Sequence, residues 1–172
     1  MSLIGQNPSS ASERTQQGDG GSGQLMFCLI SLDGQSFAIR ASAVREVIGS
    51  ALIVKVPLAP QFMAGVVNHR GAMLTTVSLR GVLGLPSAES SSCVVVMRAE
   101  RDGGECFGLL VDELTGIVTL DGSTVENIPP TVTDTAQRVL RGMYVRAQGT
   151  LVELDAEHLR PEGLAAMAHG GN

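Results

Sequence analysis

The sequence is poor in large aromatic side chains. It contains no tryptophan, one tyrosine and four phenylalanines, so aromatic residues make up 3% of the 172 positions. Hydrophobic residues still account for 44% of the chain, which means that Val, Leu, Ile and Ala must build most of the core. A chain of this length suits one domain or two closely packed small subdomains.

Concentrated positive charge is also missing. The chain has 12 basic and 17 acidic residues, a formal net charge of −5, and no basic cluster. Binding to nucleic acid requires Lys and Arg gathered along the phosphate backbone. The composition therefore argues against a nucleic-acid partner.

Long apolar runs are absent as well. No window approaches the ~18 consecutive apolar residues of a transmembrane helix, and the N-terminus lacks the charged and apolar regions of a secretory signal. We therefore expect a cytoplasmic protein without direct membrane insertion. Cys28, Cys93 and Cys106 are odd in number, far apart and set in apolar runs. This pattern favours buried reduced thiols over a disulfide or a metal site.

Catalytic motifs are equally scarce. His69, His158 and His169 are scattered over a turn, a late helix and a tail, and none pairs with a cysteine at metal-ligand spacing. The chain has no Gly-x-Ser-x-Gly element, phosphate loop or Rossmann signature. We expect no catalytic residue, no metal and no cofactor, and a divergent enzyme is the minor alternative.

Polar segments flank and divide the apolar part of the chain. Residues 1–23 are rich in Ser, Gln and Gly and cannot bury enough apolar surface to offset their ordering entropy, which predicts a disordered N-terminal tail. Residues 161–172 are expected to form a C-terminal tail, weakly helical at most, in which Pro161 interrupts a preceding helix. The globular part, residues 24–160, is divided near 86–92 by a Ser-rich segment.

Short strands and glycine turns dominate the globular part. Residues 24–32 are nearly all apolar, as in a strand covered on both faces, and Asp33-Gly34 predicts a hairpin turn after them. Further runs of this kind follow to residue 154. Many short strands with few short helices indicate an all-β fold, which we expect to be two small barrels sharing an apolar seam.

One segment has a different period. Val44, Val47 and Ile48 fall at positions i, i+3 and i+4, which predicts a short helix over residues 41–48. Its polar edge would carry Glu46.

The segment from Val56 to Leu79 places an arginine at a turn. Residues 65–67 and 73–79 have the apolar, β-branched character of strands, and Asn68-His69-Arg70-Gly71 between them has the character of a turn. Gly71 can supply a positive φ angle. Arg70 is therefore expected at the tip of a hairpin, where it is either a solvated charge or a binding residue; the local pattern alone favours the former.

The order of these features resembles the CheW-like domain of bacterial chemotaxis coupling proteins. The resemblance spans about residues 24–160, and its Gly-Val-Val-Asn-x-Arg-Gly and Val-Asp elements are specific when they occur together. The matching pieces are Phe37–Ile39, Val44–Val47, Val56–Pro60, Phe62–Gly71, Val77–Leu79, Gly108–Asp112 and Leu151–Leu159.

The resemblance implies two packed five-stranded SH3-like barrels and a non-catalytic signalling adaptor. Such an adaptor couples the cytoplasmic tips of methyl-accepting chemoreceptors to a CheA-type histidine kinase by imitating the regulatory domain of that kinase. It implies receptor binding near Arg70 and Asn68, and partner contacts through Val44 and Glu46. A non-catalytic regulatory barrel that binds another signalling partner is the alternative.

Two positions depart from the family pattern. His69 stands where the residue is usually aliphatic, and Ser78 replaces the aspartate that usually precedes the leucine at Leu79. The missing carboxylate leaves open whether the adaptor serves flagellar chemotaxis or a related system such as pilus motility.

Overall fold

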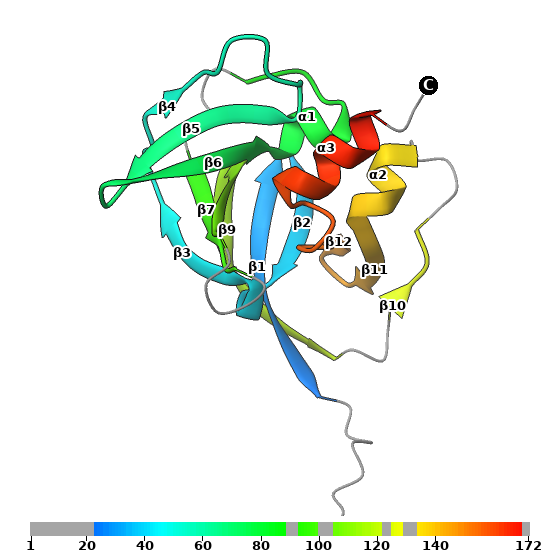
Figure 1. Ribbon diagram of the computed structural model, residues 1–172. Helices are drawn as coiled ribbons and strands as arrows, with labels where there is room; N and C mark the ends of the chain where they lie inside the picture. Colours follow the sequence, from blue (N-terminus) through cyan, green and yellow to red (C-terminus); the bar gives the residue numbers. More distant parts are fainter. Residues whose placement is uncertain (1–22, 89–92, 100–104, 122–124, 129–133, 170–172) are drawn as a thin grey trace, which may run out of the picture.

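The computed structural model describes residues 23–88, 93–99, 105–121, 125–128 and 134–169. Within these ranges the protein consists of two β-sheets with short helices gathered along one side (Figure 1). Residues 1–22, which the sequence assigns to a disordered tail, lie outside the described part.

Each sheet has six strands. The first sheet has the order β10-β11-β12-β2-β1-β9 and the second has the order β3-β7-β8-β6-β5-β4. The strands of the first sheet are β1 (Gln24–Leu32), β2 (Gln35–Arg40), β9 (Glu113–Asp121), β10 (Val125–Glu126), β11 (Leu140–Arg146) and β12 (Gly149–Leu154). Those of the second are β3 (Val44–Ile48), β4 (Ile53–Val54), β5 (Met63–His69), β6 (Ala72–Ser78), β7 (Cys93–Met97) and β8 (Phe107–Val111).

The expected all-β class with two packed barrels is confirmed, and each sheet adds a strand of two residues, β4 or β10, to the five expected. The division near residues 86–92 does not separate the two sheets. Strands β7 and β8 follow that segment but pair within the sheet of β3–β6, and β1 and β2 pair with strands from the end of the chain. Two parallel strand pairings, β12 with β2 and β6 with β8, join strands that are far apart in the sequence within each sheet.

The largest hydrophobic cluster lies between the sheets and confirms the apolar seam. It combines residues of β1, β2 and β12 with residues of β6, β7 and β8. Strand β1 shows how one strand serves two clusters. Cys28, Ile30 and Leu32 face this shared cluster, whereas Phe27 packs with Tyr144 in a cluster within the first sheet. The apolar character of residues 27–32 therefore reflects packing on both faces of the strand.

The helix predicted over residues 41–48 is wrong. Residues Ala41–Ala43 form a single 3-10 turn, and Val44–Ile48 form strand β3, which pairs antiparallel with β7. Its burial alternates, with Val44, Glu46 and Ile48 half-buried and the residues between them exposed. Three apolar positions cannot distinguish the helical period from this alternation, and β-branched residues favour the strand.

The predicted C-terminal tail is also wrong. Residues Pro161–His169 form helix α3, and Leu164 is buried in the cluster between the sheets. Pro161 starts this helix instead of interrupting one, since the first helical position needs no backbone N–H donor. Helices α1 (Leu79–Leu83) and α2 (Asp134–Val139) lie near α3 along the same side of the molecule (Figure 1).

Helix α1 shows what replaces the usual aspartate. The Ser78 hydroxyl accepts a hydrogen bond of 3.1 Å from the Gly81 backbone N–H and thereby caps the helix. Gly81 is required by close packing, because a Cβ atom there would lie 2.2 Å from the carbonyl oxygen of Gln61. The cap and the glycine together hold the start of α1 against the segment that precedes β5.

Candidate functional site at the hairpin tip

The predicted hairpin is present, with Arg70 at its tip. Strands β5 and β6 are joined by Arg70 and Gly71, whose φ angles are +53° and +84°. Two successive positive φ angles match the right-handed twist of the flanking strands. The Asn68 side-chain oxygen accepts a hydrogen bond of 3.1 Å from the Gly71 N–H. Asn68 therefore holds the turn together, and Arg70 adopts a backbone conformation that is uncommon for a residue with a side chain.

Glu46 joins this tip to strand β3. The Arg70 Nη2 donates a hydrogen bond of 2.8 Å to Glu46 Oε2, and His69 Nε2 lies 2.9 Å from Glu46 Oε1. Arg45 Nε lies 3.8 Å from the same Oε1 atom. One carboxylate thus gathers three nitrogen-bearing side chains, two of which come from the hairpin.

The cluster has an electrostatic consequence for Glu46. The hydrogen bond with His69 lowers the pKa of the Glu46 carboxyl, partial burial opposes this effect, and the charges of Arg70, His69 and Arg45 lower it further. The carboxylate is therefore ionised wherever the cluster is intact at neutral pH. Arg70 remains 73% exposed at its side chain, so its other donors reach solvent.

The structure brings together two of the four residues that the resemblance singled out. Glu46 and Arg70 are in direct contact, and Asn68 is exposed in the same turn. Val44 is half-buried and packs against the cluster between the sheets. Burial alternates between half-buried Val44 and exposed Arg45, as in a strand, and the helix predicted for this segment did not take that alternation into account.

Two further residues of the site were not predicted. Arg45 Nη1 donates a hydrogen bond of 3.3 Å to Cys106 Sγ, which lies just before β8, and His69 contacts Glu46. These contacts join residues 23 and 61 positions apart. No local pattern in the sequence reports contacts of this range.

The Val-Asp element of the resemblance has a structural role. The guanidinium of Arg80 binds both carboxylate oxygens of Asp112, with Nε 2.7 Å from Oδ1. Asp112 also accepts the backbone N–H of Asp33, in the turn between β1 and β2. The Arg80 side chain is only 12% exposed. Asp112 therefore ties α1 to the other sheet and is not displayed for a partner.

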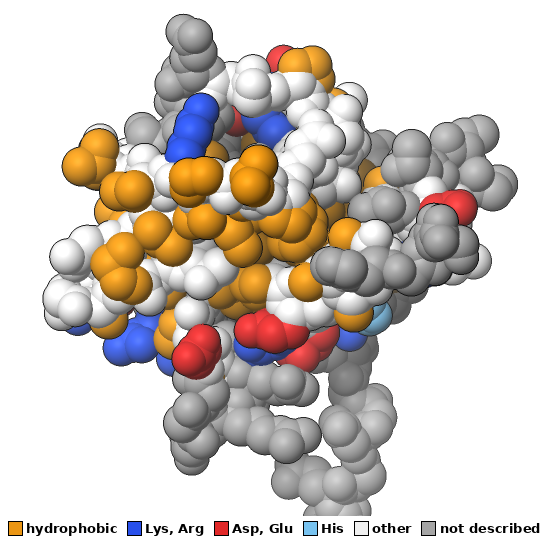
Figure 2. Space-filling view, turned by 45° about the horizontal axis from the view of Figure 1, so that its top comes forward, with side chains coloured by type: hydrophobic (Ala, Val, Ile, Leu, Met, Phe, Trp, Pro, Cys, Tyr) orange, Lys and Arg blue, Asp and Glu red, His pale blue; other side chains and the backbone are white. Residues whose placement is uncertain are grey.

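Exposed apolar side chains gather on the face near β4. Leu52, Val54, Val56 and Leu58 are 84%, 56%, 41% and 105% exposed. Figure 2, in which the top of Figure 1 comes forward, shows hydrophobic side chains grouped across this face of the molecule. Contiguous exposed apolar surface of this kind is typical of a protein-binding face.

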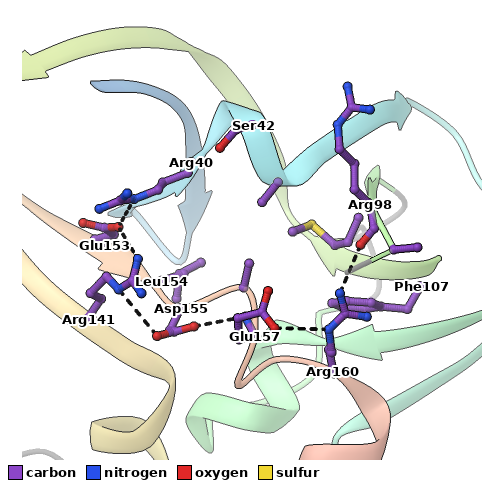
Figure 3. Close-up of a pocket in the computed structure, with 14 residues that line it drawn as sticks. Arg40, Ser42, Arg98, Phe107, Arg141, Glu153, Leu154, Asp155, Glu157 and Arg160 are labelled. Carbon is purple, nitrogen blue, oxygen red and sulfur yellow. Dashed lines mark hydrogen bonds and ion pairs between the residues drawn. The ribbon is translucent and has the colours of Figure 1, made fainter. Parts of the chain in front are cut away.

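A cavity of about 340 Å³ lies between the two sheets and is lined by charged side chains. Figure 3 shows Arg40 turned toward Glu153, Arg141 between Glu153 and Asp155, and Arg160 beside Glu157. Each of these three arginines thus lies close to a carboxylate that also lines the cavity. The pairs that Arg40 and Arg141 form with Glu153 lie within the first sheet, so these charged groups of the cavity lining already have partners there.

Nothing in the described ranges forms a metal site, because no three His, Cys, Asp or Glu side chains there are placed to hold an ion. Cys28, Cys93 and Cys106 are free thiols, and burial raises the pKa of Cys28 and of Cys93. Among the described helices, none is long and apolar enough to cross a membrane.

Fold and site together define a class of protein: two packed β-barrels that display a charged hairpin tip and an apolar face. Comparison with known proteins identifies the family. The CheW-like domain matches residues 26–162, and the chain belongs to this family.

The relatives agree in name. "Chemotaxis protein CheW" of Rhizobium meliloti is 33% identical over 125 residues, which cover 71% of this chain and 79% of that protein. "Probable chemotaxis protein CheW" of Rhizobium etli is 29% identical over 136 residues, covering 77% and 86%. The crystal structure of the scaffolding protein TtCheW from Thermoanaerobacter tengcongensis shares the fold, with a TM-score of 0.69 and 21% identity over 85% of this chain and 94% of that one.

Proposed function

We propose that this protein is a non-catalytic coupling protein of a bacterial chemosensory pathway. It links the cytoplasmic tips of methyl-accepting chemoreceptors to the regulatory domain of a CheA-type histidine kinase, in the cytoplasm beneath the receptor arrays. The observation that carries this proposal is the match of the CheW-like domain across residues 26–162, in a fold that presents Arg70 at a hairpin tip.

Arg70 suits the role of a receptor contact. Its guanidinium uses one donor on Glu46, while the rest of the side chain is exposed. A planar group with five N–H donors can hold a carboxylate of a partner by two parallel hydrogen bonds. Asn68 contributes by fixing the turn. Glu46 stays within the proposed surface because its carboxylate directs the Arg70 side chain.

The apolar face near β4 supports a protein partner over a small-molecule one. Side chains such as Leu52 and Leu58 are almost fully exposed and are of the kind that a protein interface buries. The alternative function, a regulatory barrel that binds an unrelated partner, lacks comparable support, because the matched relatives are named as chemotaxis proteins.

The test is a binding titration of the protein against a receptor-tip fragment and, separately, against the regulatory domain of the host's CheA-like kinase. Arg70→Glu is expected to weaken receptor binding at least about tenfold, or roughly 1.4 kcal/mol. Its melting midpoint should stay near that of the wild type, because an exposed substitution changes stability by about 0.5 kcal/mol or less.

Arg138→Glu is the matched control. Arg138 is an exposed residue of α2, so this substitution makes the same charge reversal away from the hairpin. Equal dissociation constants for the wild type and Arg70→Glu would remove Arg70 from the site. Failure of the wild type to bind either fragment would contradict the proposed function as a whole.

A further inference from the structure

The hairpin tip contains a histidine that shares a carboxylate with Arg70. His69 Nε2 and Arg70 Nη2 contact different oxygens of Glu46, at 2.9 Å and 2.8 Å. Histidine is the side chain that gains or loses its charge between about pH 5 and pH 8. A change in the charge of His69 therefore acts directly on the group that holds Arg70.

Exposure distinguishes the three side chains. Those of His69 and Glu46 are 21% and 25% exposed, whereas that of Arg70 is 73% exposed. Water therefore screens the interaction between His69 and Glu46 less than it screens the interaction between Arg70 and Glu46. Arg70 is thus the member of the cluster that a partner can reach, and the His69–Glu46 pair lies behind it.

The other charged groups around His69 balance one another. Arg45 comes from β3, next to Glu46. A cavity of about 400 Å³ that His69 lines also contains Glu105, Cys106, Arg160 and Glu162, contributed by the segment before β8 and by the chain around the start of α3. Arg45 and Arg160 offset Glu105 and Glu162 in formal charge. Among these groups, Glu46 is the carboxylate within hydrogen-bond distance of the imidazole.

An acidic partner must compete with Glu46 for Arg70. While His69 is neutral, its Nε2–H can donate to Glu46, but Arg70 supplies a full positive charge that the carboxylate would lose when Arg70 turns to a partner. Once His69 is protonated, Glu46 keeps a cation beside it. The two positive charges also repel each other, and both attract a partner carboxylate. All three effects favour the transfer of Arg70 from Glu46 to the partner.

We propose that His69 is a positioning residue whose protonation loosens the hold of Glu46 on Arg70, so that an acidic receptor segment binds more tightly as the pH falls. This inference rests on the proposed function, in which Arg70 contacts the receptor. Linkage requires the reciprocal effect: if protonation favours binding, binding must favour protonation. The complex therefore takes up protons from the solution when it forms.

The first test measures the dissociation constant of a receptor-tip fragment across the pH range in which histidine titrates. For the wild type it is expected to fall about threefold between about pH 8 and pH 6, an effect within the range of partly exposed charge pairs. His69→Leu should remove this dependence.

His158→Leu is the matched control. His158 is 54% exposed, its Nδ1 lies 3.3 Å from Asp155 Oδ2, and it belongs to the segment before α3. Like His69 it lies beside a carboxylate, but its partner is Asp155 and not Glu46, so its loss should leave the pH dependence of binding intact. Calorimetry in buffers of different ionisation enthalpy should detect proton uptake with the wild type and less with His69→Leu. A pH dependence in His69→Leu equal to that of the wild type would overturn the proposal.

The second test needs no partner. Nuclear magnetic resonance signals of the Arg70 guanidinium should shift and exchange faster as His69 is protonated in the free protein, and His69→Leu should abolish this response. Signals that stay unchanged from about pH 8 to pH 5.5 would overturn the inference. If the wild type binds neither fragment, the proposed function fails instead, and if Arg70→Glu does not weaken receptor binding, Arg70 is removed from the site. In both cases the free-protein measurement still decides whether protonation of His69 loosens the contact between Glu46 and Arg70.

Discussion

The hydroxyl of Tyr144 donates a hydrogen bond of 2.8 Å to Oε2 of Glu153, whose side chain is 1% exposed. The second oxygen, Oε1, accepts 2.8 Å from Arg40 Nε. The three residues come from β11, β12 and β2, three adjacent strands of the first sheet. A buried charge is tolerated when it is paired and hydrogen-bonded, which is the case for this carboxylate.

The first prediction concerns alkaline stability. Burial, together with the hydrogen bond to Glu153 and its charge, raises the pKa of Tyr144 to about 12, although Arg40 and Arg141 act in the opposite direction. The folded protein therefore retains the tyrosine proton at pH values where the unfolded chain, with a pKa of about 10, has lost it. This stabilisation is fully present below about pH 10 and is lost as the pH rises to about 12, on the order of 2–3 kcal/mol.

The measurement is direct because Tyr144 is the sole tyrosine of the chain. An absorbance titration of tyrosinate should give a midpoint well above 10 in the native protein, compared with the ordinary value of about 10 in denaturant. Tyr144→Phe should lose less stability in the same alkaline window. A native titration at the ordinary value would show that the ring is not held as described.

A second prediction separates two neighbouring leucines of β8. Leu109 is fully buried in the cluster between the sheets, and Leu110 is half-buried against a smaller cluster of the second sheet. Leu109→Ala should destabilise the protein by about 2–5 kcal/mol, and Leu110→Ala by distinctly less. Chemical denaturation of both variants measures the difference. A larger loss for Leu110→Ala would mean that the strand faces the other way.

The register of β8 illustrates what the sequence leaves undecided. Residues 107–111 are almost continuously apolar, so alternation cannot show which face meets the larger core, and on sequence grounds Leu110 is as good a core candidate as Leu109. In β3 the cause was different, because its three apolar positions fit a helical period as well as the alternation of a strand. The apolar run of β1 and the hairpin at Arg70 were predictable, because their signals are local.

Contacts between residues far apart in the sequence could not be predicted from such local signals. The contact between Glu46 and Arg70 joins residues 24 positions apart, and the parallel pairing of β12 with β2 joins opposite ends of the chain. Both depend on how the sheets close, which is decided by packing over the whole molecule. The resemblance to a family suggested both residues of the Glu46–Arg70 pair as site residues, but the structure was needed to show that they touch.

The third prediction tests whether α3 belongs to the folded core. Leu164 is 3% exposed and packs in the cluster between the sheets, whereas Glu162 in the same helix is exposed. Leu164→Ala should therefore destabilise the protein by about 2–5 kcal/mol, and Glu162→Ala should have little effect. Thermal unfolding compares the two variants. Equal melting midpoints would restore the interpretation of this segment as a tail.

The last prediction concerns Ser78, where the family usually has aspartate. Its hydroxyl caps α1 by accepting the Gly81 N–H. Serine and aspartate are nearly equal as N-caps, and replacement by alanine typically costs about 1 kcal/mol. Ser78→Ala should therefore destabilise the protein by about that amount, and Ser78→Asp should leave its stability within about 0.5 kcal/mol of the wild type.

Denaturation curves measure these differences, and a receptor-binding titration of Ser78→Asp completes the test. If the position serves only to cap α1, restoring the carboxylate should leave the dissociation constant for a receptor-tip fragment unchanged. A stable Ser78→Asp variant with a strongly altered dissociation constant would instead place this position at the partner surface. The serine would then be a specificity difference between this protein and its relatives, because the cap it forms is one that aspartate supplies equally well.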